Sequence, residues 1–250
     1  MNRKNKYYLI FLILGIPVVI YFYFLICRTY VINGDDLSTF IDVSNAKENS
    51  SILNLFTNVG KFRPVSAFVS KFIFQTFQKN LTAYYLFNVF IQTLNTFIFA
   101  FCLNFFLRSP LLSVIFSLLY ALTRFSFFIT SQPLSGGCLE GLALTFFLLS
   151  YFFILFTLCG KGKTYYTFLA SILFANLSIY THERYIVLYP LFFLVLFFFP
   201  TLKTLSIKHK SILAITIISS VVINVAIKKL FYSMPFFVGT GGTNISFSFV

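Results

Sequence analysis

The chain has 250 residues, of which 58% are hydrophobic and only 10% charged, and its mean hydropathy is +0.88. Such a composition leaves too little polar surface to cover a soluble globule, so it excludes a soluble domain and indicates an integral, multi-pass membrane protein. The formal net charge is +13, but no basic motif accompanies it, so we expect anionic membrane lipids and no nucleic acid as partners.

Apolar runs long enough to cross the roughly 30 Å hydrocarbon layer recur along the chain. They predict an all-α fold, a polytopic transmembrane bundle of about seven helices in a single domain of residues 1–250. The predicted spans are Tyr7–Cys27, Tyr84–Leu107, Leu111–Ile129, Leu139–Leu158, Tyr165–Tyr180, Tyr185–Phe199 and Ser211–Ile227. The fifth and sixth spans are separated only by residues 181–184, so we expect them to form a tight hairpin.

The connection after the first span, residues 28–83, contains a further apolar stretch at Val65–Phe77. This stretch is only about four turns long and carries Lys71 and Gln75, so we expect it to lie along the membrane surface. A shorter interfacial helix is expected at Leu37–Ile41. Both would pack over the outer ends of the spanning helices.

The charges divide between the two sides that this topology defines. All charged residues in the loops assigned to the cytoplasm are basic. They are Arg3, Lys4, Lys6, Arg108, Lys161, Lys163, Lys203, Lys208 and Lys210. The other side contains ten basic residues, Arg63, Arg124 and Arg184 among them, and all six acids: Asp35, Asp36, Asp42, Glu48, Glu140 and Glu183. The positive-inside rule therefore predicts a cytoplasmic N-terminus in a plasma (inner) membrane, with the acids facing outward.

Cysteine and glycine patterns indicate no resident cofactor. The four cysteines, at positions 27, 102, 138 and 159, lack CxxC spacing, so we expect packing residues rather than a metal site or a disulfide framework. No glycine-rich phosphate loop follows a strand. One carboxylate pair, Asp35 and Asp36, is compatible with a divalent metal but offers no other obvious ligand.

The candidate site consists of the polar residues predicted at the outer membrane boundary, because ionisable groups there are costly unless they are paired or functional. They are Asp35, Asp36, Lys61, Arg63, Asn88, His182, Glu183 and Arg184. Each group also has a structural explanation. The aspartates can cap a helix that starts at Leu37, and Arg63 can extend its side chain to the interface. Asn88, Gln92 and Asn95 share one helical face and can form hydrogen bonds to other helices. Residues 182–184 can form a polar loop tip.

The order of these features resembles the GT-C superfamily of polyprenyl-phosphate-dependent glycosyltransferases, in particular its protein O-mannosyltransferase-like and lipid A-modifying branches. The matching segments are the aspartate pair after the first span, "FRPVS", "FNVFIQTLN" and "HERYIVLYPLFFL". Two positions depart from the family motifs: Tyr85 stands where the histidine of H-x-x-N is common, and His182 replaces the lysine of K-E. The resemblance implies that residues 1–250 form the N-terminal transmembrane part of the family fold. From the sequence itself we expect no soluble domain within these residues.

This resemblance also implies a reaction. A sugar moves from a polyprenyl-phosphate donor to a lipid, glycan or protein acceptor at the outer face, with inversion at the anomeric carbon. Arg63, Arg184 and Lys61 would hold the phosphate, because guanidinium and ammonium groups neutralise its charge. Asp35 or Asp36 would be the catalytic base, since desolvation near the hydrocarbon edge raises the pKa of a carboxylate. Asp35 is favoured because it lies closer to the helix end.

Two other functions remain open at this point. A transporter or flippase would also bury polar residues between helices, but it is expected to have internal repeats and broken helices near mid-membrane. No internal repeat is evident in the sequence. A non-catalytic membrane protein is the other alternative.

Overall fold

The computed structural model describes residues 3–28, 36–37, 40–41, 62–160, 164–198, 206–232, 237–238 and 244–245. The described elements are the helices α1 (Arg3–Cys27), α4 (Pro64–Phe77), α5 (Leu81–Leu107), α6 (Pro110–Ala121), α7 (Arg124–Ser131), the π-helix η1 (Ser135–Gly141), α8 (Leu142–Leu158), α9 (Thr164–Thr181), the 3-10 helix η2 (Glu183–Leu188), α10 (Pro190–Phe198) and α11 (Ile207–Tyr232). Two strands, β1 (Phe237–Val238) and β2 (Asn244–Ile245), pair antiparallel.

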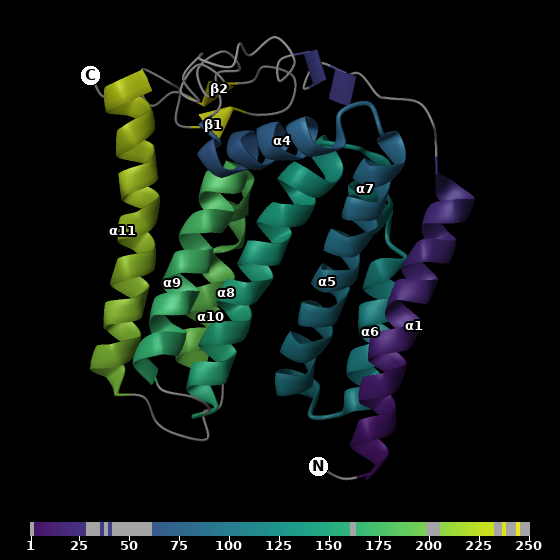
Figure 1. Ribbon diagram of the computed structural model, residues 1–250. Helices are drawn as coiled ribbons and strands as arrows, with labels where there is room; N and C mark the ends of the chain where they lie inside the picture. The colour runs from purple at the N-terminus through teal and green to yellow at the C-terminus, as the bar shows by residue number, and fades with distance from the viewer. Residues whose placement is uncertain are drawn as a thin grey trace.

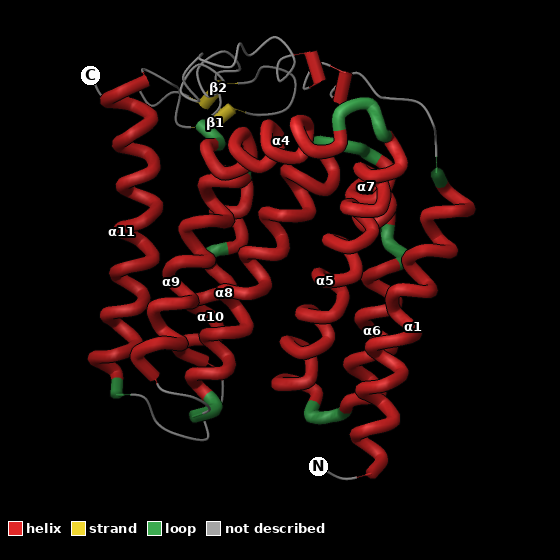
Figure 2. The backbone as a smooth tube through the Cα atoms, in the orientation of Figure 1, coloured by secondary structure: helices red, strands yellow, loops and turns green. Residues whose placement is uncertain are grey.

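Most helices run up and down a single bundle, and α4 crosses one end of it (Figure 1). The turn between α5 and α6, the end of α8 and the start of α11 all lie at the opposite end, where α1 begins (Figure 2). We call these two ends the α4 end and the N-terminal end. The placement of α4 across the bundle is the arrangement expected for Val65–Phe77.

Four helical segments are long and apolar enough to cross a membrane: Leu9–Cys27, Leu81–Leu107, Ser135–Leu158 and Ile207–Leu230. The pair α6 and α7, bent by 60°, makes a fifth if it is one span. The multi-pass all-α fold is thereby confirmed, whereas the count of seven is not. The predicted spans at 165–180 and 185–199 are not among these segments, because Thr, Tyr and Ser side chains and one Asn lower the hydropathy of α9, and α10 has only 9 residues.

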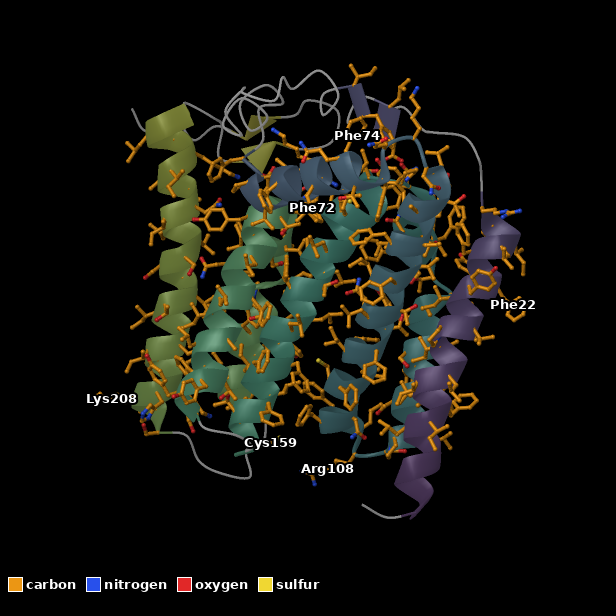
Figure 3. The ribbon with its side chains drawn as sticks, viewed as in Figure 1. Phe22, Phe72, Phe74, Arg108, Cys159 and Lys208 are labelled. Atoms are coloured by element: carbon orange, nitrogen blue, oxygen red, sulfur yellow. The ribbon has the colours of Figure 1, made fainter. Side chains whose placement is uncertain are left out.

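Large apolar side chains cover the outer faces of the bundle. Phe22, Ile26, Leu169 and Leu230 are 57%, 80%, 54% and 77% exposed, and Phe22 points away from the other helices (Figure 3). Soluble monomers rarely expose contiguous apolar surface on this scale. These faces therefore suit contact with lipid tails.

Small polar side chains join α8 to α9. The hydroxyl of Ser150 donates to the carbonyl of Ser171 at 2.8 Å, and that of Ser178 donates to the carbonyl of Ala143 at 2.9 Å. Lipid tails provide no hydrophobic drive for helix association, so helices in a bilayer associate through close packing of small residues and such hydrogen bonds. Aromatic packing of Phe147 with Phe192, with ring centroids 5.1 Å apart, extends this core to α10.

A stripe of amides on α5 stabilises the broken helices beside it. Asn88 Nδ2 donates to the carbonyl of Gln132 at 2.6 Å, where α7 ends, and Asn95 Nδ2 donates to the carbonyl of Gly141 at 3.0 Å, where η1 ends. Gln92 Nε2 donates to the hydroxyl of Ser126. Backbone carbonyls that leave regular helix pairing need such partners inside a membrane. These bonds are the interhelical bonds that the structural alternative for Asn88 predicted.

Gly137 lets Asn88 lie against η1. A Cβ at position 137 would overlap Asn88 Oδ1 and lie 2.6 Å from its Cγ. We expect Gly137→Ala to lower the free energy of unfolding by about 1–3 kcal/mol, because overpacking a buried site forces neighbours out of place. Thermal unfolding of the purified protein measures this effect. Gly15→Ala is the matched control, since its nearest neighbour would be the Phe11 ring at an ordinary 3.6 Å, and an equal loss in both variants would contradict the explanation.

Candidate functional site

Charged side chains from four parts of the chain meet at the α4 end. Arg63 precedes α4, Glu140 belongs to η1, residues 182–184 join α9 to η2, and Lys228 belongs to α11. We call Arg63, Glu140, His182, Glu183, Arg184 and Lys228 the ionic cluster. At the opposite, N-terminal end lie Arg108, Cys159 and Lys208 (Figure 3). All three acids among the described residues, Asp36, Glu140 and Glu183, belong to the α4 end, which agrees with the predicted separation of charge.

Glu183 forms the more buried half of the ionic cluster. Its Oε1 lies 3.6 Å from the guanidinium of Arg63, and its Oε2 accepts a hydrogen bond from Lys228 Nζ at 3.3 Å. Glu183 and Lys228 are 2% and 4% exposed. The two ion pairs connect the loop before α4, the α9–η2 junction and α11.

Glu140 forms the other half, nearer the surface. His182 Nε2 lies 3.1 Å from Glu140 Oε1, and Arg184 approaches the same oxygen at 3.8 Å. The hydroxyl of Tyr185 donates to the backbone carbonyl of Glu140 at 3.1 Å. The polar loop at 182–184 is therefore fixed against η1.

The bonds of His182 favour a neutral imidazole. Its Nδ1 accepts a hydrogen bond from the backbone N–H of Arg184 at 3.2 Å, which caps η2, so the ring proton resides on Nε2 and points to Glu140. Burial lowers the pKa of His182 below its usual 6.5, although Glu140 acts in the opposite direction. Protonating Nδ1 would also remove the cap from the backbone of η2.

This geometry predicts a pH-dependent stability. Because the pKa is lower in the folded than in the unfolded protein, the contribution of His182 is complete above about pH 6.5 and is lost as the pH falls through the folded-state pKa. We expect the melting temperature to fall between about pH 7.5 and about pH 5.5, and to fall less in His182→Gln. The other histidine, exposed His209, supplies the control: His209→Gln should retain the parent dependence. Identical pH profiles for both variants would refute the assignment.

The ionic cluster carries an excess of positive charge. Three cations, Arg63, Arg184 and Lys228, surround two carboxylates, and His182 is neutral in the bonding pattern above. Burial lowers the pKa of Arg63, and its Nε is buried without a hydrogen-bond partner among the described residues. A desolvated guanidinium with an unused donor is suited to a phosphate oxygen.

Asp36 lies at the same end of the bundle and makes a contact with η1 that the sequence analysis did not predict. Its carboxylate is fully buried, and Oδ1 accepts the backbone N–H groups of Leu134 at 3.2 Å and Ser135 at 2.8 Å. Asp36 thus caps the start of η1.

The structure brings together four predicted site residues, Arg63, His182, Glu183 and Arg184, while Asn88 lies apart in the α5 stripe. Asp35 and Lys61 fall outside the described residues. Sequence reasoning missed two members of the ionic cluster, Glu140 and Lys228. Glu140 had a signal, as one of only six acids, and Lys228 had a weaker one, as a cation directly after a predicted span.

No group of three or more His, Cys, Asp or Glu side chains within the described part of the chain could hold a metal ion. All four cysteines are free thiols.

Comparisons with protein-family models, curated proteins and solved structures find no match to this chain. The resemblance to GT-C glycosyltransferases accordingly stays a prediction that depends on the motifs quoted above.

Proposed function

We propose that this protein is a membrane glycosyltransferase that moves a sugar from a polyprenyl-phosphate donor to an acceptor, with inversion, at the α4 end of the bundle. The observation that carries the proposal is the ionic cluster beneath α4. Its excess positive charge and the unused Nε donor of Arg63 suit a lipid-linked phosphate at headgroup level. The position of α4 across the bundle, expected from the length and polarity of Val65–Phe77, would place this cluster near the lipid headgroups.

In the proposed reaction, the acceptor hydroxyl attacks the anomeric carbon of the sugar while the bond from that carbon to the phosphate oxygen breaks. The electron pair leaves with the phosphate, which gains one negative charge that Arg63 and Arg184 stabilise. The hydroxyl proton passes to Asp35 or Asp36. A single displacement of this kind inverts the anomeric centre and forms no covalent intermediate.

The proposed orientation places the α4 end outside and the N-terminal end in the cytoplasm of an inner (plasma) membrane, with about seven crossings. Support comes from the described acids, which all belong to the α4 end, and from the basic residues Arg108 and Lys208 at the other end. Four long apolar helices and the bent pair α6–α7 account for five of these crossings, and the other two would be α9 and η2–α10.

Transport is the second candidate function, and one observation favours it. The 60° bend between α6 and α7 and the π-helix η1 interrupt regular helices, as in many transporters. However, the amides of α5 already satisfy the carbonyls of Gln132 and Gly141 at these interruptions. The breaks therefore have a structural partner inside the protein.

Purified protein reconstituted in vesicles distinguishes the two functions. Radiolabelled polyprenyl-phosphate hexoses are added to one leaflet, together with a membrane extract as the source of acceptors. The transferase proposal expects the label to leave the polyprenyl carrier and appear in a glycosylated product. Movement of the intact donor to the other leaflet, without any product, would support transport and overturn the proposal.

A further inference from the structure

An apolar cleft lies at the N-terminal end, away from the ionic cluster and independent of the proposed reaction. It has a volume of about 430 Å³ and lies between the last turn of α5, the middle of α8 and α10. Phe106, Tyr151, Leu194 and Phe198 contribute to its walls. This volume falls within the roughly 300–1,000 Å³ of typical ligand pockets.

The walls of the cleft reach the outer surface of the bundle. Phe106, Leu194 and Phe198 are 44%, 53% and 79% exposed. In a membrane-spanning bundle, such side chains face lipid rather than water. An acyl chain can therefore enter the cleft sideways from the bilayer.

Among the described residues that line the cleft, Arg108 is the one cation. It follows the last residue of α5 and adopts a left-handed backbone conformation, φ 49°, at a position where glycine is usual. Arg108 forms no ion pair with any described residue, and the described acids all lie at the other end of the bundle. Lys208 adds a second positive charge to this end (Figure 3). A headgroup that complements the cleft is consequently negative.

We propose that this cleft is a binding site for an anionic glycerophospholipid, with one acyl chain between α5, α8 and α10 and the lipid phosphate at Arg108. The site differs from the proposed donor site in its end of the bundle and in its chemistry. It needs one cation and an apolar slot, whereas the donor site is a cluster of paired charges. A lipid bound here would join α5 to α10.

The absence of tryptophan from the chain permits a direct test. A single tryptophan is introduced as Phe106→Trp, and its fluorescence is quenched by brominated phosphatidylglycerol or by brominated phosphatidylcholine in reconstituted vesicles. We expect phosphatidylglycerol to bind about fivefold more tightly, the effect of roughly one basic residue near a headgroup. Tyr165→Trp, which is 73% exposed at the same end and outside the cleft, should report no such preference.

Further variants in the Phe106→Trp background assign the preference to Arg108. Arg108→Gln should abolish the preference for phosphatidylglycerol, whereas Arg108→Lys should retain it. Lys208→Gln should leave this preference unchanged. Phe198→Trp provides a second reporter in the cleft should Phe106→Trp fail to fold. Equal quenching by both lipids at the cleft reporter, the same preference at Tyr165→Trp, or a preference that survives Arg108→Gln would overturn the proposal.

Discussion

Replacing both Asp35 and Asp36 by Asn is expected to lower the rate of sugar transfer by about 100- to 10,000-fold, the usual contribution of a general base. An amide cannot take the proton of the acceptor hydroxyl, whereas the phosphate contacts of the donor are unaffected. The turnover number should therefore fall while the donor affinity changes little. The two single variants, measured with a labelled polyprenyl-phosphate hexose, identify which aspartate is the base.

The structure separates the catalytic from the capping role of Asp36. Asn at position 36 keeps an oxygen that can accept from the N–H groups of Leu134 and Ser135, so Asp36→Asn should fold as the parent does. Asp36→Ala loses this acceptor and should lower the free energy of unfolding by about 0.5–2 kcal/mol, as other helix caps do. Full transfer activity in the folded double Asn variant would leave capping as the role of Asp36 and refute the base assignment.

Glu183→Gln is expected to lower the free energy of unfolding by about 3–5 kcal/mol, the typical cost of leaving buried charges without their partner. The substitution would place Lys228, 4% exposed, beside Arg63 with no carboxylate between them. Repulsion between the two cations adds to the cost of their desolvation. Unfolding by heat or by a denaturing detergent measures the difference from the parent.

A double-mutant cycle provides the control for this buried pair. Adding Lys228→Met to Glu183→Gln removes the second charge, so the double variant should be more stable than Glu183→Gln alone. Lys208→Met, at the exposed start of α11, should change stability little. Additive losses in the double variant would show that Glu183 and Lys228 do not stabilise each other.

Four spanning helices could be predicted from hydropathy because most residues along them are apolar, whether they face lipid or another helix. The positions at which these helices start and break could not be predicted in this way. The predicted span Leu111–Ile129 is divided at Leu122–Thr123, and α8 follows a π-helix that begins at Ser135. Apolar content is similar on both sides of such a bend, and the hydrogen bonds that stabilise it come from α5. Hydropathy therefore locates the segment but not its shape.

The candidate site was predictable in part. Arg63 and residues 182–184 stood out because charges at the membrane boundary are rare, and the structure pairs Arg63 with Glu183. Lys228 and Glu140 join them through tertiary packing across about 45 residues of sequence, which no local pattern encodes. The cap that Asp36 supplies to η1, 98 residues away, is equally invisible to local reasoning.

Binding of a labelled polyprenyl phosphate to the purified protein tests most directly whether the ionic cluster holds the donor phosphate. The measurement compares the parent with Arg63→Gln, Arg63→Lys and Arg108→Gln, after thermal unfolding has shown that each variant is folded. The proposed function predicts that Arg63→Gln weakens binding by roughly tenfold to 100-fold, the range for one charged hydrogen bond, that Arg63→Lys weakens it less, and that Arg108→Gln has no effect. Equal affinity in the parent and Arg63→Gln, or a loss confined to Arg108→Gln, would contradict a donor site at the α4 end.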